Sequence, residues 1–202
     1  DIIEGHIAPG SILDVGCGPG FFLDAAQQRG WRVEAMEMNE RCVERLRQEG
    51  IPVCTDPLEY SSLQGGAYSA VTMWEVLEHL REPVEALREV HRLLVDGGLL
   101  LVCVPNFSSL VNRIMHEKAG TFAGHSHINF FVADILVRMQ EEAGFEVLEV
   151  ETVITEMGTI NNFLSFSEPY LGEADNVLPL LTSEYIHTHM LGSRLLTVAK
   201  AK

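Results

Sequence analysis

The chain has 202 residues, 47% of them hydrophobic, and a formal net charge of −15. This length suits one well-buried core rather than two domains, and no apolar run approaches the roughly 20 residues of a membrane span, so we expect a soluble protein. Nucleic-acid affinity comes largely from cationic side chains, so the negative charge argues against a nucleic acid and favours a small-molecule partner.

The cysteines and the N-terminal sequence indicate the cellular compartment in which the protein is expected. No secretory signal is visible, and the cysteines lie far apart without a C-x-x-C pair; they are Cys17, Cys42, Cys54 and Cys103. Separate thiols of this kind fit a reducing compartment better than structural zinc or a disulfide framework. We therefore expect a cytoplasmic protein.

The first half of the chain alternates predicted strands and helices. Short apolar runs predict strands at 11–15, 32–37, 51–54, 68–74 and 99–104. Helix-forming stretches lie between them, at 21–29, from Asn39 to Gln48, and after Pro83 until Asp96-Gly97-Gly98 stops the helix. This alternation predicts an α/β fold with a doubly wound, Rossmann-like, mostly parallel sheet in a three-layer αβα arrangement.

The second half is less regular. Helices are predicted at 109–117 and 132–143, the latter closed by Gly144, with a Gly/His-rich loop at 119–129 between them. A sixth strand at 145–153 and an antiparallel last strand at 195–199 complete the sheet. They flank residues 154–192, an apolar insertion of about 40 residues, which is longer than ordinary connections. We expect one domain over 1–202, with this insertion acting as a lid or as an oligomerisation element that would form a homodimer.

A glycine-rich turn follows the first strand, with the sequence Gly16-Cys17-Gly18-Pro19-Gly20. Glycines let the backbone approach a ligand closely, and the following helix offers unpaired N–H groups. Glu37 ends the second strand, where an acid accepts hydrogen bonds from ribose hydroxyls. Asp14 would repel a pyrophosphate but not a sulfonium. The sequence therefore predicts a site for a nucleoside cofactor that carries positive charge.

The segment Ile12-Leu13-Asp14-Val15-Gly16-Cys17-Gly18-Pro19-Gly20 resembles the first motif of class I S-adenosylmethionine (SAM)-dependent methyltransferases. The resemblance implies that glycines line the methionine moiety, that Glu37 holds the ribose and that Asp56 faces the adenine amine. Pro57 lacks an N–H group, so a backbone donor to adenine must come from Leu58 or be missing. The expected cofactor residues are Asp14, Gly16, Cys17, Gly18, Gly20, Phe21, Glu37, Met38, Asp56, Pro57, Leu58, Trp74 and Glu75.

A second group of polar residues follows the fourth strand, in the segment Trp74-Glu75-Val76-Leu77-Glu78-His79-Leu80. Together with Val104-Pro105-Asn106 and with His125-Ser126-His127 before Phe130-Phe131, it resembles a branch that includes quinol O-methyltransferases and small-RNA 2′-O-methyltransferases. The resemblance implies that a divalent metal orients a hydroxyl nucleophile, with the ligands Glu75, Glu78, His79 and His127. Without metal, either His79 or His127 would act as general base.

The catalytic candidates are therefore His79, His127 and Glu75. Purely structural roles remain as alternatives: Glu78 could cap or pair with a neighbouring helix residue, and His79 could be a partly buried histidine whose hydrogen bonds are satisfied. We expect a SAM-dependent methyltransferase (EC 2.1.1.-) that transfers a methyl group to a hydroxyl of a small molecule. Methylation of nitrogen or carbon is an alternative. So is a nicotinamide-dependent oxidoreductase, although its G-x-G-x-x-G pattern fits this turn poorly. A third is a binding module that has lost the chemistry.

Overall fold

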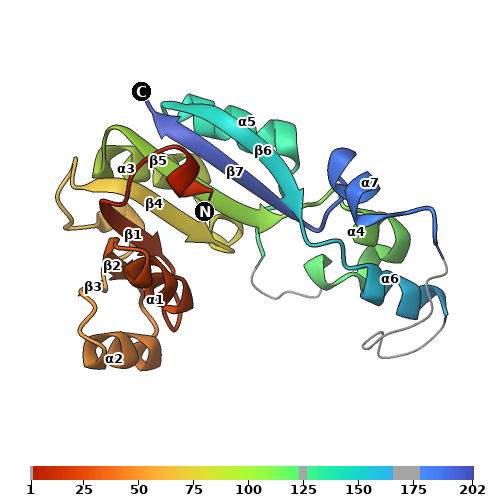
Figure 1. The fold of residues 1–202 in the computed structure, drawn as a ribbon, viewed down its shortest axis with the longest axis horizontal. Helices are drawn as coiled ribbons and strands as arrows, with labels where there is room; N and C mark the ends of the chain where they lie inside the picture. Colours follow the sequence, from red (N-terminus) through yellow and green to blue (C-terminus); the bar gives the residue numbers. More distant parts are fainter. Residues whose placement is uncertain (1, 123–126, 166–177) are drawn as a thin grey trace.

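The computed structural model describes residues 2–122, 127–165 and 178–202, and its seven strands form one sheet in the order β3-β2-β1-β4-β5-β7-β6 (Figure 1). The strands are β1 (Ser11–Val15), β2 (Arg32–Met36), β3 (Val53–Cys54), β4 (Tyr68–Trp74), β5 (Leu94–Pro105), β6 (Phe145–Val153) and β7 (Arg194–Ala201). Neighbours pair in parallel from β3 to β5, whereas β7 is antiparallel to both β5 and β6. The predicted fold class and the antiparallel last strand are confirmed.

Helices cover both faces of the sheet, which gives the predicted three layers. The α-helices are α1 (Phe21–Gln28), α2 (Glu40–Gln48), α3 (Pro83–Leu93), α4 (Leu110–Met115), α5 (Ala133–Glu142), α6 (Met157–Leu164) and α7 (Ser183–Thr188). Short 3₁₀ helices are η1 (Ile3–Gly5), η2 (Leu58–Tyr60), η3 (Leu77–His79), η4 (His116–Lys118) and η5 (Gly120–Phe122). Because successive strand residues point to opposite faces, Leu13 packs with α3 and α5 while Ile12 packs with α1 and α2.

Local sequence signals fix several of these helix ends. The Asn39 side chain caps α2 by accepting from Arg41 N and Cys42 N. Pro83 occupies the first turn of α3, where its missing N–H group costs nothing. Gly144 follows α5 with a φ of 103°, as expected for a C′ glycine.

The predicted stop of the third helix is wrong. Helix α3 ends at Leu93, and Leu94 already pairs with Tyr68 as the first residue of β5. The glycines of Asp96-Gly97-Gly98 lie inside β5, where the register to β4 shifts before Leu99, and Gly97 has a φ of 74°. The turn residues therefore form a bulge in a strand rather than a helix stop, because burial of Leu94 in the core outweighs the local turn propensity.

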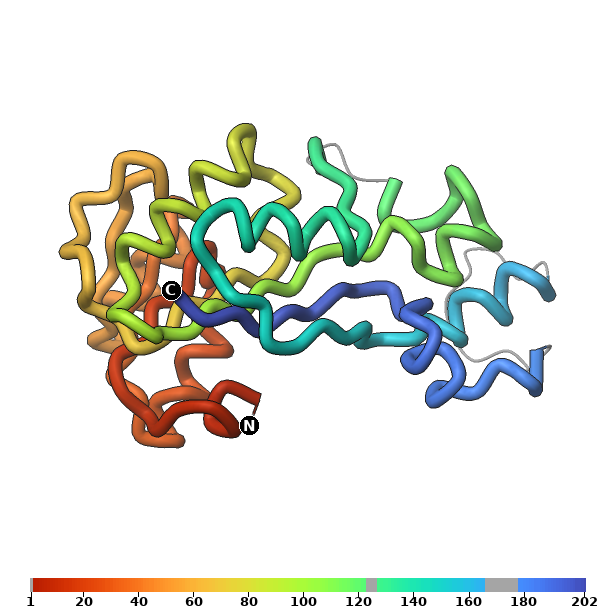
Figure 2. Tube along the Cα trace, turned by 90° about the horizontal axis from the view of Figure 1, so that it is seen from above, coloured from red at the N-terminus to blue at the C-terminus, as the bar shows by residue number. Residues whose placement is uncertain are grey.

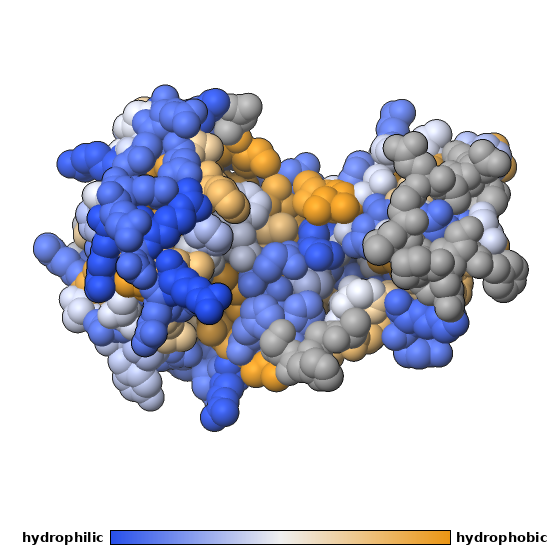
Figure 3. Space-filling model, turned by 90° about the horizontal axis from the view of Figure 1, so that it is seen from below, coloured by the Kyte–Doolittle hydropathy of each residue, from blue (hydrophilic) through white to orange (hydrophobic). Residues whose placement is uncertain are grey.

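The carboxyl ends of β1 to β6 share one edge of the sheet, and the candidate functional site lies along this edge. Beyond this edge, α4, α6 and α7 lie at the opposite end of the molecule from β1–β3 (Figures 1 and 2). Between the two ends, one face of the surface is hollowed (Figure 3). Among the described residues, no helix is both long and apolar enough to span a lipid bilayer.

The described part of the 154–192 insertion packs on the chain itself. Helix α6 contacts α4 through a small apolar core that contains Val111, Met115, Ala119 and Ile160. Residues 166–177 of the insertion lie outside the described residues. Its proposed roles as a lid or an oligomerisation element stay predictions.

Candidate functional site

The glycine-rich turn has the backbone geometry that glycine alone adopts readily. Gly16, Gly18 and Gly20 have φ values of 67°, 54° and 87°. A Cβ on Gly16 would lie 2.6 Å from a methyl of Val76, and one on Gly20 would lie 2.5 Å from a methyl of Leu46. A Cβ on Gly18 would meet nothing within 4 Å. Two of these glycines are therefore required by packing, whereas Gly18 faces open space that a ligand can occupy.

The Glu37 carboxylate is fixed between the turn and the start of α2. Its Oε2 accepts a hydrogen bond from Gly18 N at 2.8 Å, and its Oε1 accepts from Met38 N and Asn39 N at 2.8 and 2.7 Å. Three backbone donors therefore hold the acid at the end of β2. This is where the ribose acid was expected from the sequence.

A pocket opens beside this carboxylate. Its lining residues are Val15, Gly16, Met36, Glu37, Met38, Asp56, Pro57, Leu58, Glu59, Val76 and Leu80. It thus brings together Gly16, Glu37 and the segment 56–58, as predicted for a nucleoside site. Asp56 accepts a hydrogen bond from Ser62 Oγ at 2.6 Å, and this bond lowers the pKa of the Asp56 carboxyl. Val76 and Leu80, which follow β4, were not among the expected cofactor residues, because roles after Trp74 were expected only for the polar residues of that segment.

Other expected cofactor residues lie away from this pocket. The Phe21 side chain is 71% exposed, and the guanidinium of Arg45 lies 5.0 Å from its ring centre. Trp74 packs on Phe22 on the α1 side of the sheet, with ring centroids 5.6 Å apart. Burial raises the pKa of the half-buried Cys17 thiol to about 12, so this thiol is unreactive at neutral pH.

Asp14 lies beneath the turn, almost wholly buried. The Thr72 hydroxyl donates to its Oδ1 at 2.7 Å. Burial nevertheless raises the pKa of Asp14 to about 7, with a further contribution from the negative charge of Glu37. The expected acidic group is therefore present behind the turn, where the net charge of the site depends on pH.

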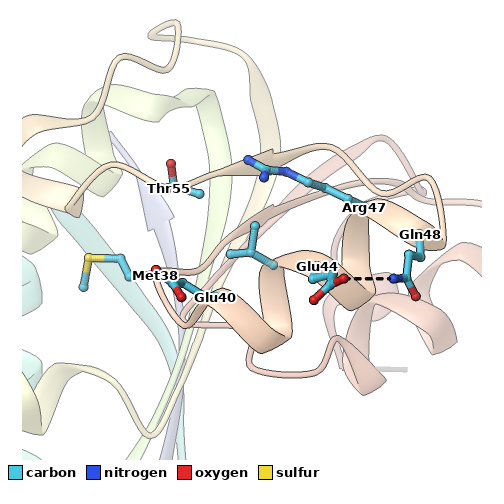
Figure 4. A pocket seen from close by; sticks show the side chains of 7 residues that line it. Met38, Glu40, Glu44, Arg47, Gln48 and Thr55 are labelled. Atoms are coloured by element: carbon cyan, nitrogen blue, oxygen red, sulfur yellow. Dashed lines mark hydrogen bonds between the residues drawn. The ribbon is translucent and has the colours of Figure 1, made fainter.

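A shallow groove lies on the outer side of α2 (Figure 4). It is lined by Met38, Glu40, Val43, Glu44, Arg47, Gln48 and Thr55, and the Gln48 amide donates to Glu44 at 3.4 Å. On the same helix, Arg45 pairs with Glu49 and Asp24. The interleaved charges on α2 therefore form a solvated, salt-bridged helix face. Met38 lines both this groove and the nucleoside pocket.

The second group of polar residues converges after β4. Glu78, His79 and His127 each offer a ligand atom, and these atoms all lie within 4.8 Å of one another. The two imidazole rings are 4.9 Å apart at their centroids. The contact joins distant parts of the chain because Ile128 N and Asn129 N both donate to the Glu78 carbonyl, at 3.0 and 3.1 Å. His125 lies outside the described residues.

Glu78 has an unusual environment for a carboxylate. Its side chain is 0% exposed, and neither oxygen has a hydrogen-bond partner among the described residues. The His79 Nε2 lies 3.8 Å from Oε1, beyond hydrogen-bond distance. Burial, and secondarily the charge of Glu75, raises the pKa of Glu78 to about 7. The Nδ1 atom of His127 is also buried and has no hydrogen-bond partner in the part of the chain that the structure describes. These orphaned atoms fit the ligand set of a divalent cation.

Glu75 stands apart from these three residues. Its Oε1 forms an ion pair with Arg194 Nε at 2.8 Å, and its backbone is left-handed, with a φ of 55°. Burial raises the pKa of the Glu75 carboxyl, while Arg194 and the two histidines act in the opposite direction. The structure therefore separates the four expected ligands into a group of three and an acid held by Arg194. Nothing in the sequence marked Arg194.

Comparisons with known proteins agree with this geometry. A family model described as a methyltransferase domain matches residues 3–150. The ubiquinone biosynthesis O-methyltransferase of Pseudomonas aeruginosa (strain UCBPP-PA14) is 31% identical over 165 residues, covering 71% of this chain and 68% of that protein. Its namesake from Pseudomonas paraeruginosa is 36% identical over 124 residues, covering 58% of this chain and 50% of that protein.

Solved structures support the fold. A SAM-dependent methyltransferase from Thermotoga maritima superposes with a TM-score of 0.70 at 21% identity, covering 99% of this chain and 86% of that one. The family match spans the glycine-rich turn, Glu37 and the segment after β4, and it favours the methyltransferase over the oxidoreductase reading. The chain belongs to the methyltransferase domain family and uses SAM as its cofactor.

Proposed function

We propose that this protein transfers the methyl group of SAM to a hydroxyl of a small molecule. The observation that carries the proposal is the convergence of Glu78, His79 and His127, whose potential ligand atoms lie within 4.8 Å of one another. Glu78 and His79 lie in the segment between Val76 and Leu80, two residues that line the nucleoside pocket. Oxygen as the acceptor atom is supported by the names of the O-methyltransferases that the chain resembles.

The cofactor supplies a methyl group already activated on a sulfonium, so the protein mainly orients the reactants and moves one proton. Glu37 holds the ribose of the cofactor, and the backbone of Gly16 and Gly18 lines its methionine moiety. His79 or His127 accepts the hydroxyl proton while the new O–C bond forms and the S–C bond breaks, leaving a neutral thioether. The carboxylate of Glu75 interacts electrostatically with both imidazoles, and its negative charge stabilises the imidazolium that forms.

The same three side chains are suited to hold a divalent cation. One carboxylate and two imidazoles form a ligand set typical of transition ions, and such an ion would lower the pKa of the acceptor hydroxyl. In that arrangement the imidazoles would be ligands, and neither would act as the general base. Metal dependence therefore separates the two routes.

Transfer of a radiolabelled methyl group from SAM tests the proposal. The acceptor probes are catechol and phenol for oxygen and aniline for nitrogen, each assayed with EDTA and after addition of Mg²⁺, Mn²⁺ or Zn²⁺. We expect label on the hydroxyl probes. We expect His79→Ala and His127→Ala to lose on the order of 10²-fold in kcat, the scale of general acid–base catalysis. The control is His6→Ala, because His6 also contacts a glutamate, Glu149, but away from this site. This control should keep full activity.

Other outcomes identify the alternatives. Label on aniline alone would move the acceptor from oxygen to nitrogen. Calorimetric binding of S-adenosylhomocysteine (SAH) without transfer to the probes or to a metabolite extract would indicate a binding module, and binding of NAD instead would indicate an oxidoreductase. A small-molecule substrate, a cytoplasmic location and a lid or homodimer role for the 154–192 insertion are part of this proposal.

A further inference from the structure

Arg194 links the methyl-transfer site to the 154–192 insertion. It is the first residue of β7, and its backbone is held on both sides, by Pro105 of β5 and Val153 of β6. Its Nε lies 2.8 Å from Glu75 Oε1, and its Nη1 lies 3.6 Å from Glu156 Oε1. One guanidinium on a rigid strand therefore contacts an acid at the end of β4 and an acid at the start of α6.

Both acids are held in uncommon backbone conformations. Among the described residues, five non-glycine residues have left-handed φ values, and Glu75 (55°) and Glu156 (52°) are two of them. A third, Ile154 at 60°, accepts a hydrogen bond from Ser193 N at 2.7 Å. Such conformations persist only where surrounding contacts impose them, and they cluster at functional sites. The chain is therefore bent at two separate places, and each bend brings a carboxylate to Arg194.

The charge of Glu75 matters to the chemistry. It lies three residues before Glu78, and protonated His79 or His127 would lower the pKa of its carboxyl. A carboxylate at this position stabilises an imidazolium only if its orientation is fixed before the reaction. The planar guanidinium fork of arginine fixes a carboxylate better than the flexible ammonium of lysine.

We propose that Arg194 is a positioning residue, whose guanidinium fixes the Glu75 carboxylate at the methyl-transfer site and ties it to Glu156 at the base of the insertion. This inference rests on the proposed function for its kinetic consequence, but the structural link from Glu75 to Glu156 is independent of the reaction.

Hydrogen exchange measured by mass spectrometry tests the structural link without an acceptor. Arg194→Met should speed exchange in two segments, 75–80 and 156–164. The matched control is Arg88→Met, since Arg88 also pairs with two glutamates, Glu85 and Glu142, but on exposed helices. This control should leave exchange in both segments unchanged. Unchanged exchange in Arg194→Met would overturn the inference, whether or not any probe is methylated.

Kinetics with catechol and SAM test the positioning. Arg194→Met should lower kcat on the order of 10²-fold, the loss expected from a misplaced catalytic group. Affinity for SAH and the KM for SAM should not change, because Arg194 does not line the nucleoside pocket. Arg194→Lys should recover part of kcat.

A double variant shows whether Arg194 acts through Glu75. If it does, Arg194→Met combined with Glu75→Gln is no slower than Glu75→Gln alone. Multiplied losses would show that the two residues act separately, which would overturn the positioning role. If catechol and the other probes are not methylated while exchange responds as expected, the link between the two acids stands and the proposed reaction fails.

Discussion

Burial raises the pKa values of two carboxyl groups at this site to about 7, but the two groups differ in their hydrogen bonding. Asp14 keeps a donor, the hydroxyl of Thr72, and adds negative charge behind the glycine-rich turn. Glu78 has no donor at all among the described residues. An ionised carboxylate in this position is stabilised only by a cation, so Glu78 is the residue from which metal binding is best judged.

Replacing Glu78 with Gln should make the metal-free protein more stable at pH 8 by about 1–3 kcal/mol, because an unpartnered buried charge is removed. The folded state favours the protonated acid, so the free energy of unfolding of the natural protein should fall as pH rises from about 4.5 to about 7. That decline should be shallower in the variant. Urea unfolding between pH 4 and 8 measures both effects.

The same variant should bind Mn²⁺ more weakly by calorimetry. A suitable control is Glu141→Gln, since Glu141 is exposed on α5. If Glu78→Gln is less stable than the natural protein at pH 8, the carboxylate has a partner that stabilises it and the proposed cation site is wrong.

At the scale of elements, the glycines of the strand–turn–helix unit from β1 to α1 have different roles, since some are needed for packing and another faces the space for a ligand. Gly16 is needed because Val76 packs against it, whereas Gly18 faces open space. Gly30 offers a matched comparison, since it is also left-handed, with a φ of 91°, and also faces open space, but beyond the end of α1.

Gly18→Ala and Gly30→Ala should each lower stability by about 1 kcal/mol through the same backbone strain. Only Gly18→Ala should weaken SAH binding, because its methyl group enters the open space in front of the glycine-rich turn, where the cofactor is expected. Gly16→Ala should be less stable than either, owing to the clash with Val76. Thermal unfolding and SAH calorimetry distinguish the three variants. Wild-type SAH affinity in Gly18→Ala would mean that the cofactor does not occupy the turn.

Sequence patterns predicted residues that the structure brings to one pocket, because these residues come from one strand–turn–helix unit and from the ends of neighbouring strands. Their contact with the cofactor stays a prediction. Glu37 and the segment 56–58 lie where the strand order brings them. Patterns failed where contacts join distant segments. The pair between Glu75 and Arg194 spans much of the chain, and Asp96-Gly97-Gly98 carries a turn signal that strand pairing overrides.

At the scale of the whole molecule, the hydrophobic core on the sheet is distinct from a smaller hydrophobic core between α4 and α6. The sheet core holds the nucleoside pocket, and the smaller core between α4 and α6 holds Ile160, which is fully buried. The separation implies that the smaller core can be weakened without altering cofactor binding.

Ile160→Ala should lower stability by about 2–5 kcal/mol, the range for truncating a buried isoleucine. SAH affinity below the melting temperature should stay unchanged. Ile135→Ala, at an exposed position on α5, should be nearly neutral in both respects. Scanning calorimetry and SAH titration check these expectations, and loss of SAH binding in Ile160→Ala would show that the two cores depend on each other.

The pairing of Val153 with Arg194 across β6 and β7 has an evolutionary consequence. The chain leaves the sheet after Val153 and returns to it at Arg194, the direct partner of Val153 on the neighbouring strand. Lengthening such a connection costs little, about 0.6 kcal/mol for each doubling. Proteins with this fold can therefore differ in the length and sequence of this segment, and so in the methyl acceptor that they use. The strands that carry the cofactor site need not change.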